Sequence, residues 1–176
     1  MKYFTKELWK RINTNDVYVR NNALKEWEMR TEEYLTAFNT IKEKFPKSFL
    51  KVYDQNECLH DYVIERITFN LRRNKYNCKL HLAHGNNDVI ILLSDVRMLS
   101  LDFSSLSLQN CIGGKMSWGY AEFDYLSDNV FTISILCDFE NEMMFGAKRI
   151  AIKHKKHGFF PRSGILSKGM VLFDTF

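Results

Sequence analysis

The chain has 176 residues, of which 45% are hydrophobic and 14% aromatic. This length and composition suit one globular domain with its own core, and they exclude extensive disorder. The net charge is only +4, because 25 basic side chains are nearly balanced by 21 acidic ones, and the two kinds are interspersed along the sequence. Such a mild balance does not favour nucleic acid, and we expect no nucleic-acid partner.

The cysteines and the N-terminal segment indicate a reducing compartment. The four cysteines are far apart and form no C-x-x-C pair, which argues against a zinc knuckle or a disulfide scaffold. Residues 1–9 carry too many charges for a signal peptide, and no segment reaches the roughly 20 apolar residues of a membrane span. We therefore expect a cytoplasmic protein that does not insert into a membrane.

The first 57 residues have the apolar spacing of helices. Thr5 and Asp16 are suited to cap two helices, and Pro46 is suited to open a third. The helical part is predicted to end near Asn56. The long second helix is predicted to bury one stripe of apolar side chains, namely Val17, Leu24, Trp27, Tyr34, Phe38, Ile41 and Phe45.

At Leu59-His60-Asp61 the apolar period shortens to two, which is typical of strands. Strands are predicted over residues 62–71, 76–83, 89–93, 96–103, 116–125, 130–139 and 143–152. Several connections are of hairpin length, so neighbouring strands are predicted to be antiparallel. The apolar parity slips within three runs, at residues 64–67, 96–99 and 120–123, and these slips predict bulges.

These patterns predict an α+β fold. N-terminal helices, about residues 5–56, are followed by an antiparallel, bent β-sheet or two-layer β-sandwich of about seven strands. We expect one domain over residues 1–176, with a helical cap at 1–57 and an antiparallel β region at 58–154. Residues 155–176 are predicted to form a basic turn and a C-terminal tail or last strand. The lysines from residue 153 onward are interpreted as a turn that protects a sheet edge.

The pair His60-Asp61 is similar to the metal-binding pair of the HD phosphohydrolases. That site also needs an earlier histidine on packed helices, whereas all five histidines here lie at position 60 or later. We interpret the pair as a turn that opens the first strand, and we expect no metal and no cofactor. A metal-dependent hydrolase that uses His60 and Asp61 with a carboxylate such as Glu122 is the alternative.

Two further sets of residues are candidate sites. Cys78, His81 and His84 have the types of zinc ligands, but an offset of three on a strand sends side chains to opposite faces, and Gly85 indicates that His84 already lies in a turn. Trp118 and Tyr120 belong to an aromatic-rich strand that suits either the core or a binding surface. The predicted binding residues are His60, Asp61, Trp118, Tyr120 and Glu122.

Three segments together resemble a bacterial family of unknown function whose members begin MKYFTKE. They are the opening MKYFTKEL, the Leu59-His60-Asp61 step, and residues 118–122, WGYAE. The resemblance covers about residues 1–152. It implies a small cytosolic bacterial protein with an N-terminal helical segment and a C-terminal β-rich domain, and it implies no reaction.

Since no constellation of residues demands a particular chemistry, we expect a non-enzymatic protein-binding module. The partner is expected to bind a face of the sheet or the helix–sheet junction, as in toxin-immunity proteins. This hypothesis predicts an exposed aromatic or acidic patch. A small-ligand binder that uses the concave face of the sheet, near Trp118 and Tyr120, is a second alternative. The sequence leaves the oligomeric state open.

Overall fold

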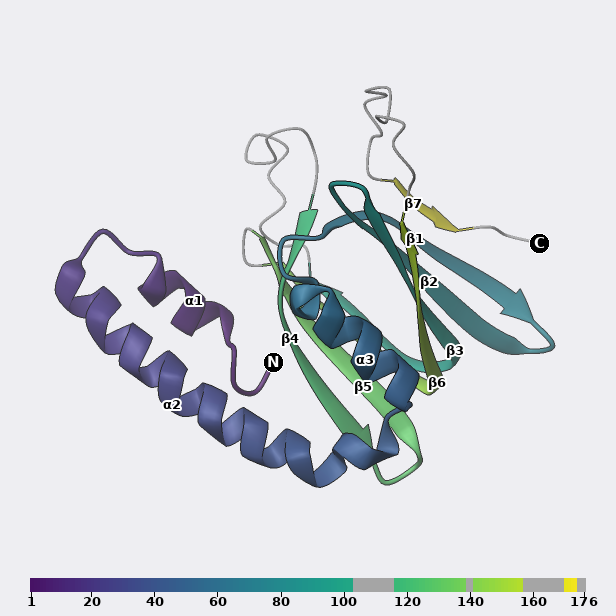
Figure 1. Ribbon diagram of the computed structural model, residues 1–176, viewed down its shortest axis with the longest axis horizontal. Helices are drawn as coiled ribbons and strands as arrows, with labels where there is room; N and C mark the ends of the chain where they lie inside the picture. The colour runs from purple at the N-terminus through teal and green to yellow at the C-terminus, as the bar shows by residue number, and fades with distance from the viewer. Residues whose placement is uncertain (103–115, 139–140, 157–169, 174–176) are drawn as a thin grey trace.

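The computed structural model describes residues 1–102, 116–138, 141–156 and 170–173. Three α-helices come first, and 3-10 turns follow the second and third of them (Figure 1): α1 Lys6–Ile12, α2 Val17–Ile41, η1 Lys42–Lys44, α3 Lys47–Gln55 and η2 Glu57–Leu59. The strands are β1 Val63–Arg72, β2 Lys75–His84, β3 Asn87–Asp102, β4 Met116–Leu126, β5 Val130–Cys137, β6 Glu142–Lys156 and β7 Met170–Phe173. The predicted α+β order, helices before an antiparallel sheet, is confirmed.

The helices begin where their capping residues predict. The Thr5 hydroxyl accepts a hydrogen bond from the Leu8 N–H at 3.3 Å, and the Asp16 carboxylate accepts from the N–H groups of Tyr18 and Val19 at 2.9 and 3.0 Å. These bonds satisfy N–H groups that have no partner within the first turn of a helix. Pro46 precedes α3, as expected for a residue with a fixed φ.

The predicted apolar stripe of α2 is buried along its C-terminal part alone. Tyr34 is 9% exposed, whereas Val17 and Leu24 are 57% and 42% exposed. The reason is visible in Figure 1, where the N-terminal half of α2 extends beyond the sheet and lies against the short α1. The helix has 25 residues and is about 38 Å long, and its C-terminal part is the part that packs on the sheet.

Two three-stranded meanders, β1–β2–β3 and β4–β5–β6, form the sheet. They are joined by a long antiparallel pairing of β3 with β6 and by a short one of β1 with β4. The six strands therefore close in a ring, but the β1–β4 contact spans just two residue pairs, so the ring is not a regular barrel. β7 pairs in parallel with β1. It is the last strand that the sequence analysis gave as one of two alternatives for the C-terminal segment.

Three bulges interrupt the strand ladders. Two of them lie where the parity slips predict them, and the third is displaced along its strand. Register shifts occur between Ile64 and Arg66 in β1 and between Val96 and Met98 in β3. The second shift bends one continuous strand, where two separate strands were predicted at residues 89–93 and 96–103. The third shift, between Trp118 and Tyr120, lies earlier than predicted. It falls at Gly119, which passes the partner strand closely, because a Cβ there would lie 2.7 Å from a backbone oxygen of β5.

α3 and the residue before Pro46 fill the inner face of the ring with aromatic side chains. Phe49 and Tyr53 pack against Phe123 with ring centroids 5.6 and 4.9 Å apart, and Phe45 lies 5.0 Å from Phe131. The concave face is therefore occupied by the protein's own core.

Two further features are the C-terminal end of β6 and the character of the helices. β6 continues to Lys156, where it pairs with Asn87, so the basic residues from Lys153 to Lys156 belong to a strand and not to a turn. Within the ranges that the structure describes, no helix combines the length and the apolar character that crossing a membrane requires.

Candidate functional site

The His60-Asp61 pair forms the predicted turn before β1. Asp61 has a φ of 64°, and its N–H donates to the Trp118 carbonyl at 2.9 Å. The His60 ring nitrogen Nδ1 lies 3.1 Å from an Asp61 carboxylate oxygen, and the two side chains are 43% and 72% exposed. The pair is thus a solvated turn that attaches the start of β1 to β4.

Tyr120 is the predicted binding residue that His60 contacts. The two rings meet edge to face with centroids 5.2 Å apart, and Tyr120 also packs on Phe4, Trp9 and Trp27. Burial raises the pKa of the Tyr120 hydroxyl, and the nearby Asp61 carboxylate adds to this effect. The cluster attaches α1 and α2 to the sheet and leaves the tyrosine half-buried.

Trp118 and Glu122 do not join this surface, so the five predicted residues do not form one cluster. Trp118 is fully buried in the core. The Glu122 carboxylate, 8% exposed, is occupied by backbone N–H groups and is not directed at His60 as the hydrolase alternative requires. Cys78 is buried and His81 half-buried on opposite faces of β2, as predicted. Among the described residues, no three histidine, cysteine or acidic side chains are grouped as metal ligands.

Glu122 instead holds the N-terminal segment against the sheet. Its Oε2 accepts a hydrogen bond from the Lys2 N–H at 2.8 Å, and its Oε1 accepts from the N–H groups of Tyr3 and Phe4, each at 2.7 Å. The N-terminal ammonium lies 3.6 Å from a Glu142 carboxylate oxygen on β6. Residues 1–4 therefore lie across the outer face of β4 and β6.

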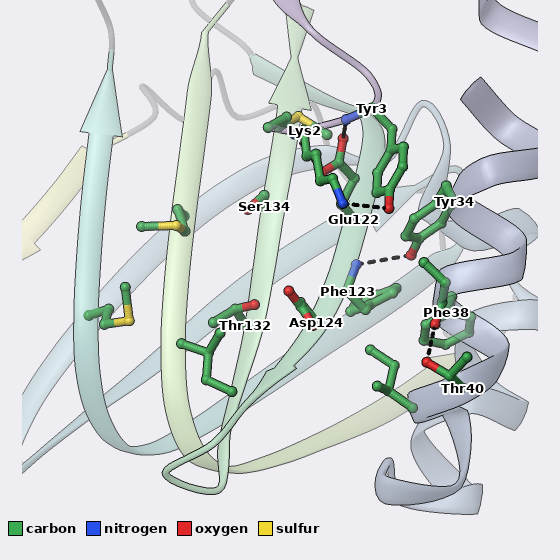
Figure 2. Close-up of a pocket in the computed structure, with 16 residues that line it drawn as sticks. Lys2, Tyr3, Tyr34, Phe38, Thr40, Glu122, Phe123, Asp124, Thr132 and Ser134 are labelled. Carbon is green, nitrogen blue, oxygen red and sulfur yellow. Dashed lines mark hydrogen bonds between the residues drawn. The ribbon is translucent and has the colours of Figure 1, made fainter. Parts of the chain in front are cut away.

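A groove of about 470 Å³ opens between this N-terminal segment, α2 and the outer face of the sheet. In Figure 2, Tyr34, Phe38 and Thr40 on α2 face Thr132 and Ser134 across it. The floor continues over β6 and β3, where Met144 and Met98 line it. This is the largest change from the predicted site, because the groove lies at the helix–sheet junction but on the outer side of the ring.

The wall formed by α2 is fixed to the edge of β4. The Tyr34 hydroxyl accepts a hydrogen bond from the Phe123 N–H at 2.9 Å, and burial raises the pKa of that hydroxyl far above its ordinary range. A neutral tyrosine oxygen thus satisfies a backbone donor on a strand edge that β1 does not reach. The groove has a rigid wall for this reason.

The floor is apolar with small hydroxyl groups. Met98 is 37% exposed and lies beside Gly146 of β6, where an added Cβ would come within 3.0 Å of the Met98 Cβ. The glycine therefore lets the methionine side chain lie low over the sheet. Thr132 is buried, and Asp124 lies exposed at the mouth. Flexible, polarizable methionine side chains adapt readily to different apolar ligands.

One side of the groove ends at a free strand edge. The pairing of β3 with β2 stops at Ser94, while its pairing with β6 continues to Asp102. From Arg97 to Leu101 the second edge of β3 is unpaired within the described part of the chain, and residues 97–100 are exposed. The parity slip at residues 96–99 was the sequence signal for this change of strand environment.

No family model matches the chain, and no curated protein matches it either. The resemblance to the family that begins MKYFTKE therefore stays a prediction.

Proposed function

We propose that this protein is a non-enzymatic binding module that takes an extended segment of another protein into the groove at the helix–sheet junction. The observation that carries the proposal is the continuity of the apolar groove with the unpaired edge of β3. Met98 belongs to both, since it lines the groove and lies on that edge segment.

Strand addition is the binding mode that this arrangement favours. A partner segment that pairs with residues 97–101 would gain main-chain hydrogen bonds over about 16 Å, and alternate side chains would point to one face of the sheet. On the outer face those side chains would enter the groove beside Met98 and Met144. Backbone pairing would supply affinity, and the shape of the groove would supply specificity.

Two buried titratable groups of the groove support binding over catalysis. The Glu122 carboxylate accepts three backbone N–H groups, and the Tyr34 hydroxyl accepts a fourth. General acid or base catalysis needs a group within reach of a substrate and free to exchange a proton, whereas these two are engaged in structural hydrogen bonds.

A toxin-immunity protein is one class that would act in this way, by occupying a surface that its partner needs. In that case the partner would be a toxin with an exposed extended segment. The proposed mode does not depend on this identity.

The test is affinity purification of the tagged full-length protein from its own host. The variants are Met98→Lys, which places a charge in the groove, and Met29→Lys, which places it on the exposed side of α2, where Met29 is 54% exposed. We expect the wild type and Met29→Lys to retain a stoichiometric protein and Met98→Lys to lose it. Binding of that purified protein is then measured by calorimetry. Equal retention by both variants, or no stoichiometric partner, would contradict the proposal.

A further inference from the structure

The fold separates charges that alternate along the sequence. The β4–β5 hairpin, residues 116–138, contains four acidic residues and no lysine or arginine. The basic residues gather instead on the outer face of the sheet formed by β1, β2, β3 and β6. A net charge that is small for the whole chain therefore conceals one strongly basic face.

The register of the strands brings these residues together. Asn70, Asn77, Ser94 and Arg149 lie side by side across β1, β2, β3 and β6. In the next row toward the β1–β2 hairpin tip, Arg72 pairs with Lys75. In the next row away from the tip, Thr68 pairs with Lys79.

These residues surround a hollow of about 620 Å³. Its lining includes five cationic side chains and no carboxylate: Arg72, Arg73, Lys75, Lys79 and Arg149. At the rim, Asp95 binds the Lys75 ammonium at 2.9 Å. In the ranges that the structure describes, the other four cations have no carboxylate partner within ion-pair distance. Four positive charges are thus left to a ligand.

The basic surface continues beyond the hollow. Lys153 lies on the same face of β6 as Arg149. It belongs to the cross-strand row that also contains Arg66 and His81. Burial lowers the pKa of His81; the nearby Arg66 and Lys79 lower it further, and Glu65 and Asp88 raise it. From the row of Arg72 to the row of Lys153 the surface extends about 20 Å, since alternate strand residues are about 6.6 Å apart. The strip ends where Asp88 lies opposite Lys155.

We infer that this basic hollow binds the phosphate backbone of single-stranded nucleic acid. Arginine and lysine are the residues that bind phosphate through charge-assisted hydrogen bonds, and repeated phosphates match a strip too long for one small anion. A hollow of this size accepts a ligand of drug-like volume, so one or two nucleotides of a flexible single strand can enter it. The inference concerns a different face from the protein-binding groove and goes beyond that proposed function.

The test is fluorescence anisotropy of the full-length protein with a labelled twelve-nucleotide oligo(U). The variant is Lys79→Glu with Arg149→Glu, and the control is Lys25→Glu with Lys47→Glu, an equal charge change at exposed positions of α2 and α3. We expect the plot of log affinity against log salt to have a slope of about −3, for four phosphate contacts. The variant is expected to lose about tenfold in affinity and to reduce the slope by about 1.4, while the control stays within about twofold.

Two further ligands and one further variant make the result decisive. A duplex of the same sequence and a polyglutamate of equal charge are each expected to bind about tenfold more weakly than the single strand. Met98→Lys is expected to bind oligo(U) normally, so that failure of the groove and failure of the basic face are distinguishable. Absence of binding at low salt, equal loss in the control variant, or equal binding of duplex or polyglutamate would overturn the inference.

Discussion

The hydroxyl group of Tyr34, in the C-terminal half of α2, accepts a hydrogen bond from the backbone N–H of Phe123 on β4 at 2.9 Å. The two residues are far apart in the sequence, and this contact attaches the long helix to a strand edge that would otherwise be open. The groove depends on it, because α2 forms one wall and β4 part of the floor.

Replacing Tyr34 by Phe removes the acceptor and leaves the buried Phe123 N–H without its partner. We expect the free energy of unfolding to fall by about 1–3 kcal/mol, the cost of a buried unsatisfied donor. Urea denaturation measures this change. Tyr18→Phe, at a site that is 77% exposed, is the matched control and should be neutral. Equal small effects of both substitutions would show that the bond is not important for stability.

The Glu122 carboxylate is predicted to fix the N-terminal segment. Glu122→Gln puts an amide where a carboxylate accepts three N–H groups, so we expect a loss of about 2 kcal/mol in stability. We also expect faster hydrogen exchange at the amides of Lys2, Tyr3 and Phe4. The control is Asp124→Asn, two residues further along β4 and exposed. Unchanged exchange at residues 2–4 would contradict this role.

Gly119 allows the bulge that separates Trp118 from Tyr120. Because a Cβ at this position would lie 2.7 Å from the Leu136 carbonyl oxygen, Gly119→Ala must displace β4 from β5. We expect a destabilisation of about 1–3 kcal/mol, as for other overpacked sites. Thermal unfolding measures it, with Ser127→Ala in the exposed β4–β5 turn as the control. A Tm equal to that of the control would refute the close approach.

The stability is predicted to fall in alkaline solution. Burial raises the pKa of the Cys78 thiol to about 12, from an ordinary value of 9.0. Above about pH 9 the unfolded chain releases this proton and the folded protein keeps it, so the unfolded state is favoured as the pH rises. Buried Cys137, Tyr34 and Tyr53 act in the same direction, since burial raises the pKa of each.

Cys78→Ala isolates the contribution of this thiol. Between pH 9.5 and 11 the wild type should lose about 1.4 kcal/mol per pH unit more than the variant, measured by urea denaturation under reducing conditions. The difference between the two proteins at pH 7 reports the lost packing and serves as the internal control. Parallel pH dependences would mean that Cys78 is not buried as described.

Local features of the fold could be predicted from the sequence, and long-range ones could not. Capping by Thr5 and Asp16, and the bulges near Ile64 and Met98, depend on a few neighbouring residues, so periodicity was sufficient. The burial of Val17 was predicted wrongly because the spacing of a helix does not show where the sheet beneath it ends.

The candidate site required the register of distant strands. Glu122 looked like an ordinary polar residue of a strand, since its three N–H donors belong to the first four residues of the chain. Met98 and Gly146 meet through the β3–β6 ladder, which no local pattern specifies. The basic face was hidden for the same reason, because Lys79 and Arg149 are far apart in sequence and acidic residues lie between them.

Hydrogen exchange of the protein, alone and with its purified partner, distinguishes strand addition at the groove from binding elsewhere. The groove and the β3 edge are predicted to bind an extended segment, so exchange should slow at the amides of residues 97–101 and along α2 from Tyr34 to Ile41. Amides of the β1–β2 hairpin tip, residues 71–76, should be unaffected. Protection confined to residues outside the groove, or no protection of β3, would contradict the account.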